Sequence, residues 1–167
     1  QISREVLLRA MLIVSANDAA RTLAADIGGS QDGLVSLMNA AAASLGLAGT
    51  VAMNPIGLDA AGAHSTARDL ATLASLLMQD ETFRATVART SATLHGQTFH
   101  ATNDAFLTTY PGADGVKTGH TTEAGYCLAA SATRDGRRIV VVVLGSSSDA
   151  ARVAAASQLL DWAFTQA

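Results

Sequence analysis

The chain has 167 residues, of which 49% are hydrophobic and 15% charged, and its net charge is −3. This length and composition allow a sizeable core and exclude a disordered protein. The absence of a basic stripe argues against a nucleic-acid partner, and the longest apolar runs, VLLRAMLIV and IVVVVLG, are too short to span a bilayer.

The first part of the chain, residues 1–90, is expected to be mainly helical. Residues 5–14 are apolar on nearly every face, which predicts a helix buried on all sides. After a polar break at residues 15–18, an amphipathic helix is expected to end at Gly28 and Gly29. Residues 30–45 predict another helix, and its apolar face consists of Leu34, Leu37, Met38, Ala41 and Leu45.

An ordered loop and a further helix complete this part. Residues 54–64, NPIGLDAAGAH, have the composition of an ordered loop. Ser65 is predicted to cap the helix that follows, with Asp69 in its first turn.

The second part, residues 91–167, is expected to contain an antiparallel sheet and a closing helix. Hairpins are predicted around Gly96 and at Asp135-Gly136, a dipeptide that tolerates the positive φ angles of tight turns. The unbroken run of valines at 140–143 predicts a strand covered on both faces. A serine-capped helix then presents Val153, Leu160, Trp162 and Phe164 for packing. The whole chain predicts a single α+β domain with helices on both faces of the sheet.

Two short polar clusters carry the candidate chemistry. Ser15 and Asn17 stand at the end of an apolar helix, where capping is the simplest role of both residues. The run KTGH at 117–120 contains the only lysine in a chain with ten arginines. A lone lysine is most simply a solvated charge, but lysine also places one compact cation where a guanidinium does not fit. Gly119 in a strand is typical of a close approach by a ligand or another backbone.

The two clusters together resemble an ordered signature. Serine β-lactamases and penicillin-binding proteins carry S-x-x-K, then a motif of the S-x-N type, then K-T-G. The segments SANDAARTLA, GSQDGLVSLMNAAAASLGLAGT, NPIGLDAAGAHSTARDLATL and PGADGVKTGHTTEAGYCLAASATRDGRRIVVVVLG resemble, in order, the low-molecular-mass penicillin-binding proteins, the D-alanyl-D-alanine carboxypeptidases of peptidase family S11. The resemblance implies a β-lactamase/DD-peptidase-like transpeptidase fold.

The resemblance also implies roles for the catalytic residues. Ser15 would pass protons toward the leaving amine, and Asn17 would bind the peptide group of the substrate and help to hold the catalytic lysine. Lys117 would set the positive potential of the cleft and hydrogen-bond Ser15.

Substrate binding is expected at the residues that follow. Thr118 would bind the C-terminal carboxylate, and the backbone N–H of His120, after Gly119, would be one of two oxyanion-hole donors. Asp59 and His64 are expected to order their loop, and Asn103 is a possible substrate contact.

Metals and cofactors are not expected. The histidines lack metal-ligand spacing, so His64, His95 and His100 are assigned structural or surface roles. The single cysteine, Cys127, lies in an apolar run and is expected to be a buried, inert thiol. The resemblance implies neither a metal nor an organic cofactor.

One departure from the signature is decisive. Residue 114, three positions before the only lysine, is aspartate, so these 167 residues contain no S-x-x-K and no nucleophile of that motif. In the family that segment also adds strands to the sheet, so without it residues 137–145 would form an apolar edge strand prone to pairing. We therefore expect residues 1–167 to be an incomplete catalytic domain, the C-terminal part of a longer carboxypeptidase, with the N-terminal fragment either lost or docked.

Three functions follow from the resemblance. The first is a serine-type D-Ala-D-Ala carboxypeptidase that acts on peptidoglycan stem peptides through an acyl-enzyme and is acylated by β-lactams. The second is an inactive module that only binds D-Ala-D-Ala peptides, and the third is a β-lactamase or endopeptidase on the same scaffold. The family implies a location outside the cytoplasmic membrane, in the periplasm or cell envelope.

Overall fold

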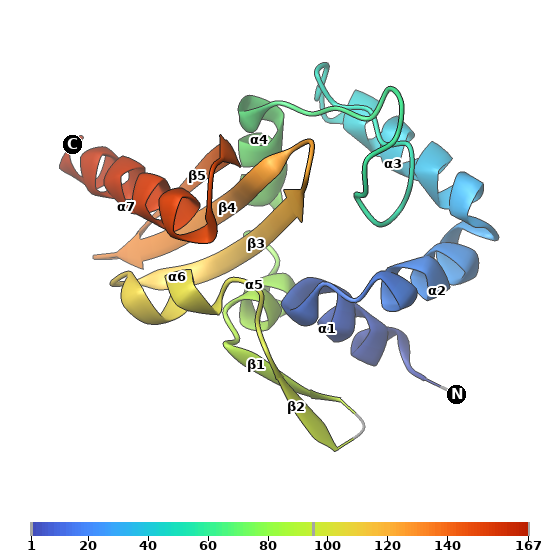
Figure 1. Ribbon diagram of the computed structural model, residues 1–167, viewed down its shortest axis with the longest axis horizontal. Coiled ribbons are helices and arrows are strands. Elements are labelled where there is room, and N and C mark those ends of the chain that lie inside the picture. Colours follow the sequence, from blue (N-terminus) through green and yellow to red (C-terminus); the bar gives the residue numbers. More distant parts are fainter. Residues whose placement is uncertain (1, 95, 167) are drawn as a thin grey trace.

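Helices dominate the first half of the computed structural model, which describes residues 2–94 and 96–166 (Figure 1). His95, for which a structural or surface role is expected, lies outside the described residues. The helices of this half are α1 (Arg4–Val14), α2 (Asn17–Gly28), α3 (Gln31–Ser44), α4 (Ala67–Leu77) and α5 (Glu81–Val87). Serine or threonine side chains cap α1, α3 and α4 at their N-termini, and Gly29 ends α2 in the left-handed conformation.

Two expectations about these helices are wrong. Helix α1 is not buried on all sides, because it buries Leu7, Ala10 and Ile13 while Leu8 is 42% exposed. The predicted apolar face of α3 is also largely open: Leu37, Met38 and Leu45 are exposed, because within the described residues α3 packs mainly on α2. Apolar periodicity identifies a helix, but it does not show what covers its face.

The cap of α4 differs from the prediction by one residue. Thr66, not Ser65, accepts the hydrogen bond from the backbone N–H of Asp69, at 3.1 Å. The Ser65 hydroxyl lies 2.9 Å from the hydroxyl of Thr50 instead, and so connects the two ends of the loop between α3 and α4. Both residues are good caps, so the sequence alone did not choose between them.

The second half of the chain forms two antiparallel sheets, as predicted. A two-stranded hairpin of β1 (Ser91–Leu94) and β2 (Gln97–His100) projects away from the main sheet (Figure 1). After α6 (Asp104–Thr109), the main sheet has the order β3-β4-β5. Its strands are β3 (Ala113–Thr121), β4 (Gly125–Arg134) and β5 (Arg137–Ser146), and α7 (Asp149–Thr165) follows, capped by Ser148.

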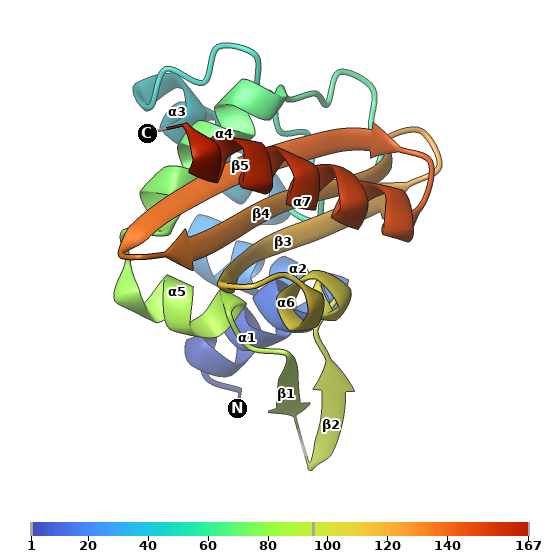
Figure 2. The same ribbon diagram turned by 90° about the vertical axis from the view of Figure 1, so that its left-hand side faces the viewer.

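Helices cover both faces of the main sheet, which confirms the predicted α+β arrangement. Figure 2 shows α7 running along one face, where Ala156 and Leu160 pack with Phe106 of α6 against Leu128 and Ala130. On the opposite face α4 and α5 bury Met78 and Val87 against β3. Trp162 of α7 does not pack as expected, because it is 63% exposed.

The outer strands leave two edges of the main sheet unpaired within the described residues. Strand β5 pairs only with β4 there, as expected of an apolar edge strand, and its four valines are half-buried. Strand β3 pairs only with β4 as well, so its other edge faces the helical half of the molecule. No described helix is long and apolar enough to cross a membrane.

Two glycines set the close approach of α2 and α3. A Cβ atom added to Gly33 would lie 2.0 Å from the carbonyl oxygen of Gly28, and one added to Gly28 would lie 2.3 Å from the backbone nitrogen of Leu34. Replacement of Gly33 by alanine is therefore expected to lower the free energy of unfolding by about 1–3 kcal/mol, measured by urea denaturation. The matched control is Ser36→Ala on the exposed side of the same helix. Equal stability of the two variants would contradict the close packing.

Candidate active site

The corner between α1 and α2 carries the first candidate side chain. Ser15 ends α1 with φ 59° and ψ 38°, a left-handed conformation that residues other than glycine seldom adopt. The chain reverses there, and the backbone N–H of Ala16 bonds to the carbonyl of Ala10 at 3.1 Å. At this corner the Ser15 hydroxyl lies within hydrogen-bond distance of Lys117 on β3. Ser15 therefore does not act as the N-terminal cap of α2, where no side-chain capping bond is present.

Lys117 meets this hydroxyl from the sheet. Its Nζ donates a hydrogen bond to Ser15 Oγ at 2.9 Å, across 102 residues of chain. The same ammonium lies 3.5 Å from Thr102 Oγ1 and donates to the carbonyl of Thr118 at 3.0 Å. The only lysine of the chain is thus surrounded by oxygen atoms and connects β3 to the helical half.

The environment of Lys117 favours its neutral form. Burial of the ammonium, together with the nearby positive charge of Arg152, lowers the pKa of Lys117 to about 8. The side chain is still mostly protonated at neutral pH and is close to the point at which it loses its charge. An amine with this pKa can attract a carboxylate and also exchange a proton with a neighbouring hydroxyl.

Arg152 of α7 connects the strands β3 and β4 next to the site. This residue of α7 is only 6% exposed. Its guanidinium donates to the carbonyls of Gly119 at 2.9 Å and Cys127 at 3.0 Å, and also binds Asp149. One side chain therefore holds the K-T-G strand and its neighbour together at the level of the site. No sequence pattern points to this residue, because it lies in an alanine-rich helix without a motif.

The remaining predicted residues lie around this centre. Gly119 is exposed and open, since a Cβ atom there would meet only Cys127, at 4.0 Å. His120 is exposed too, and its ring lies over that of Tyr126 with 4.0 Å between centroids. Thr118 is half-buried next to Lys117. Asn17 begins α2 and is exposed, with no side-chain hydrogen bond to any residue that the structure describes.

Three side chains near the site differ from expectation. Asn103, which directly precedes α6, is buried, with 5% of its surface exposed. Its neighbour Thr102, for which the sequence gives no signal, makes the contact to Lys117. Cys127 is half-buried on β4 opposite Gly119, not fully buried. Its Sγ lies 3.6 Å from the carbonyl of Ala124.

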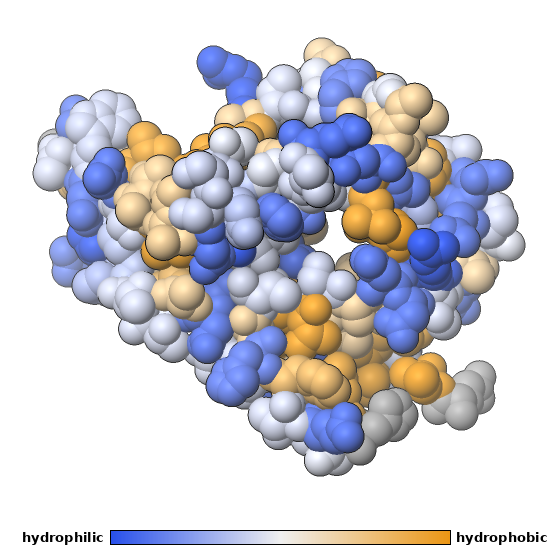
Figure 3. Space-filling model, viewed as in Figure 1, coloured by the Kyte–Doolittle hydropathy of each residue, from blue (hydrophilic) through white to orange (hydrophobic). Residues whose placement is uncertain are grey.

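An opening passes through the molecule beside the main sheet. Figure 3 shows it, and the matching view in Figure 1 places it between the main sheet, the helices α1 and α2, and the loop that joins α3 to α4. Protein interiors are normally packed to the density of organic crystals, so a gap of this kind in the middle of a domain is unusual. The opening adjoins the unpaired edge of β3, the strand that carries Lys117.

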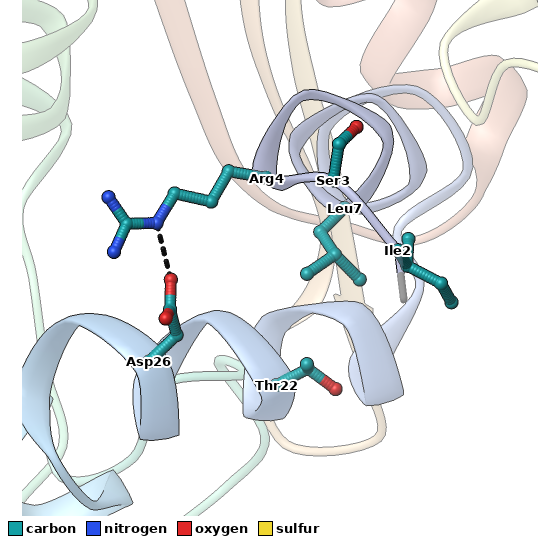
Figure 4. A pocket seen from close by; sticks show the side chains of 6 residues that line it. All are labelled: Ile2, Ser3, Arg4, Leu7, Thr22 and Asp26. Atoms are coloured by element: carbon teal, nitrogen blue, oxygen red, sulfur yellow. Dashed lines mark hydrogen bonds and ion pairs between the residues drawn. The ribbon is translucent and has the colours of Figure 1, made fainter.

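A separate pocket lies at the far end of α1. It is lined by Ile2, Ser3, Arg4, Leu7, Thr22 and Asp26, with the Arg4–Asp26 ion pair on one side (Figure 4). Ser15 stands at the opposite end of the same helix, so this pocket does not contribute to the site. Among the residues described, no group of three or more His, Cys, Asp or Glu side chains is arranged to hold a metal ion.

Comparisons with known proteins identify relatives of this chain. A family model described as Peptidase_S11, D-alanyl-D-alanine carboxypeptidase, matches residues 1–148. The chain is 39% identical over 164 residues to D-alanyl-D-alanine carboxypeptidase DacF of Bacillus subtilis, an alignment that covers 96% of the chain.

Solved structures show the same fold. The DD-transpeptidase of Streptomyces K15 superposes with a TM-score of 0.91 at 34% identity, over 96% of this chain and 67% of that one. A D-alanyl-D-alanine carboxypeptidase from Mycobacterium tuberculosis superposes with a TM-score of 0.89 at 37% identity, over 99% of this chain and 66% of that one.

The fold and the Ser15–Lys117 pair define a domain of the serine DD-peptidase class. Within that class, the chain belongs to peptidase family S11, the D-alanyl-D-alanine carboxypeptidases. It spans only part of the length of the curated relatives that it matches: 42% of the B. subtilis protein and 60% of the one from Streptomyces K15.

Proposed function

We propose that the protein containing this chain is a serine-type D-Ala-D-Ala carboxypeptidase that acts on peptidoglycan stem peptides through an acyl-enzyme and is acylated by β-lactams. The observation that carries the proposal is the hydrogen bond from Lys117 Nζ to Ser15 Oγ. It joins the two motifs of the signature that this chain contains, S-x-N and K-T-G, across a site lined by hydroxyl groups and one amine.

The proposed reaction is acyl transfer. A serine outside residues 1–167 attacks the carbonyl carbon of the penultimate D-alanine, and its proton goes to the lysine of its own S-x-x-K motif. The peptide C–N bond breaks, and the departing amine takes a proton through Ser15. Water then adds to the ester and releases the shortened peptide. A β-lactam forms the same ester but keeps its leaving amine attached.

The residues of β3 bind the substrate in this proposal. The Lys117 ammonium and the Thr118 hydroxyl hold the C-terminal carboxylate, and the backbone N–H of His120 donates to the oxyanion. Gly119 is open, so the peptide backbone can approach the strand closely. Asn17 is exposed at the start of α2, where its amide is free to bind the peptide group.

The nucleophile must come from polypeptide outside this chain. We propose that the segment with S-x-x-K occupies the opening beside β3, and that strands from the same segment pair with the free edge of β5. The gap in Figure 3 and the apolar, half-buried valines of β5 both support this placement. Because stem peptides belong to the cell wall, we further propose a location outside the cytoplasmic membrane.

One alternative function has an observation in its favour. Residues 1–167 contain a single lysine and no S-x-x-K, so without further polypeptide they can bind a D-Ala-D-Ala carboxylate but cannot form an acyl-enzyme. The presence or absence of a covalent β-lactam adduct separates this binding module from the enzyme.

Intact mass spectrometry under denaturing conditions tests the proposal. The purified protein is incubated with a large excess of penicillin, and a mass gain of one penicillin on the polypeptide that carries S-x-x-K is expected. Residues 1–167 themselves should gain no mass. If no polypeptide of the protein is acylated, the carboxypeptidase proposal fails and the binding module replaces it.

A further inference from the structure

The loop between α3 and α4 is held rigidly at its base. Val51 and His64 pair through two backbone hydrogen bonds of 2.9 and 3.2 Å, which closes residues 52–63 into a compact loop. The Asn39 side chain of α3 both donates to and accepts from the backbone of Ala52, each at 2.8 Å. Compact surface loops whose ends meet in this way frequently carry function.

Asn54 orders the interior of this loop. Its Oδ1 accepts from the backbone N–H groups of Ile56 at 3.1 Å and Gly57 at 2.8 Å. Its Nδ2 donates to the carbonyl of Leu58 at 2.8 Å. One side chain therefore fixes the turn that precedes Asp59.

One hydrogen bond attaches the far part of the loop to the sheet. The Thr121 hydroxyl at the end of β3 donates to Asp59 Oδ1 at 2.7 Å. The same oxygen accepts from the backbone N–H of Ala124 at 2.9 Å, so both the donor and an acceptor site of the hydroxyl are used. Asp59 is expected to order its loop, and the partner that the structure gives it lies on β3. Both side chains are accessible, so either can be replaced without opening the core.

The Asp59–Thr121 bond lies at the end of β3 toward which the substrate is expected to extend. In the proposed function the substrate carboxylate lies at Lys117 and Thr118, and the scissile carbonyl lies at the N–H of His120. The acyl part of the peptide, which precedes the scissile bond, must therefore extend past His120 toward Thr121. The Asp59–Thr121 bond stands at that end of the strand.

We propose that loop 52–63, latched to β3 by the Asp59–Thr121 hydrogen bond, forms the wall of the acyl-side subsite and selects long stem peptides over short ones. The inference rests on the proposed function. The Asp59–Thr121 pair touches no reacting atom; it positions the loop against the part of the substrate that precedes D-Ala-D-Ala.

The test compares two substrates in the complete protein. Thr121→Val removes the hydroxyl that donates to Asp59, and Thr121→Ser keeps it. We expect Thr121→Val to lower kcat/KM about 5- to 10-fold for a stem pentapeptide ending in D-Ala-D-Ala, through KM, as loss of one hydrogen bond to a carboxylate allows. For N-acetyl-D-Ala-D-Ala the change should stay within about twofold, since this substrate does not reach the subsite. Thr121→Ser should retain wild-type selectivity.

The control is Thr98→Val, which breaks the 3.1 Å Thr93–Thr98 hydroxyl pair on the projecting β1–β2 hairpin and should change neither substrate. The inference would be overturned if Thr121→Val lowered kcat/KM equally for both peptides. It would also be overturned if Thr121→Ser lowered kcat/KM for the pentapeptide as much as Thr121→Val does. If the wild-type protein hydrolyses neither peptide, the proposed function fails, and the inference is then judged by the ratio of the two peptides' Kd values. A ratio that is the same in wild type and Thr121→Val would overturn it.

Discussion

Replacement of Lys117 by alanine is expected to slow acylation of the complete protein by penicillin about 100- to 1000-fold. The reason is the loss of the ammonium that faces Ser15 Oγ, Thr102 Oγ1 and the Thr118 carbonyl. Removal of one preorganised electrostatic group from an active site typically costs this much in rate. The rate of covalent labelling by a fluorescent penicillin measures the effect directly.

Lys117→Arg provides the matched control for charge. It keeps a positive charge, but a planar guanidinium cannot reproduce a point cation 2.9 Å from a hydroxyl between neighbouring oxygens. We therefore expect the arginine variant to be nearly as slow as the alanine variant. Acylation at the wild-type rate in either variant would contradict the role given to Lys117. Circular dichroism verifies that both variants are folded.

The pH dependence should follow the lowered pKa of Lys117. Below about pH 8 the side chain is charged and can hold the substrate carboxylate; above it the charge is lost. kcat/KM for a D-Ala-D-Ala peptide is expected to fall about tenfold per pH unit above pH 8. For a peptide with an amidated C-terminus, which lacks the carboxylate, kcat/KM should fall much less above pH 8. A flat profile between pH 7 and 10 would contradict the assignment.

The lowered pKa of Lys117 affects folding stability in the opposite direction to activity as the pH rises. An unfolded lysine keeps its ordinary, higher pKa, so between pH 8 and that value the unfolded chain binds more protons than the folded one. Folding stability attributable to Lys117 therefore rises over the pH range in which function falls. A decline of activity above pH 8 without loss of folded protein is the combined expectation.

Local chemistry made most elements predictable. Gly29, the Asp135-Gly136 turn and the Ser148 cap each specify a backbone conformation, and the structure has elements ending or beginning at these residues. The oddity of one lysine among ten arginines also identified the centre of the site. Helix α3 shows the limit of this approach, because its apolar face depends on long-range packing that periodicity does not reveal.

The parts of the site that sequence did not predict are contacts between distant segments. Arg152 reaches the carbonyls of Gly119 and Cys127 from a helix with no motif of its own. Thr102 Oγ1 lies 3.5 Å from Lys117 Nζ because the chain that follows β2 passes close to β3. The sequence predicts that Asp59 orders its loop, but it gives no sign that the partner of Asp59 is Thr121 on β3. Each depends on a tertiary contact with no local signal in the residues involved.

At position 15, which has a left-handed backbone, the residue that gives the greatest folding stability differs from the residue that the proposed chemistry requires. An L-residue in that conformation costs roughly 1–2 kcal/mol, a cost that glycine avoids. Glycine would make a more stable corner between α1 and α2, yet it would remove the hydroxyl to which Lys117 donates at 2.9 Å. The serine therefore records a trade-off in which stability has been given up for a hydroxyl, and variants selected only for thermal robustness would tend to lose it.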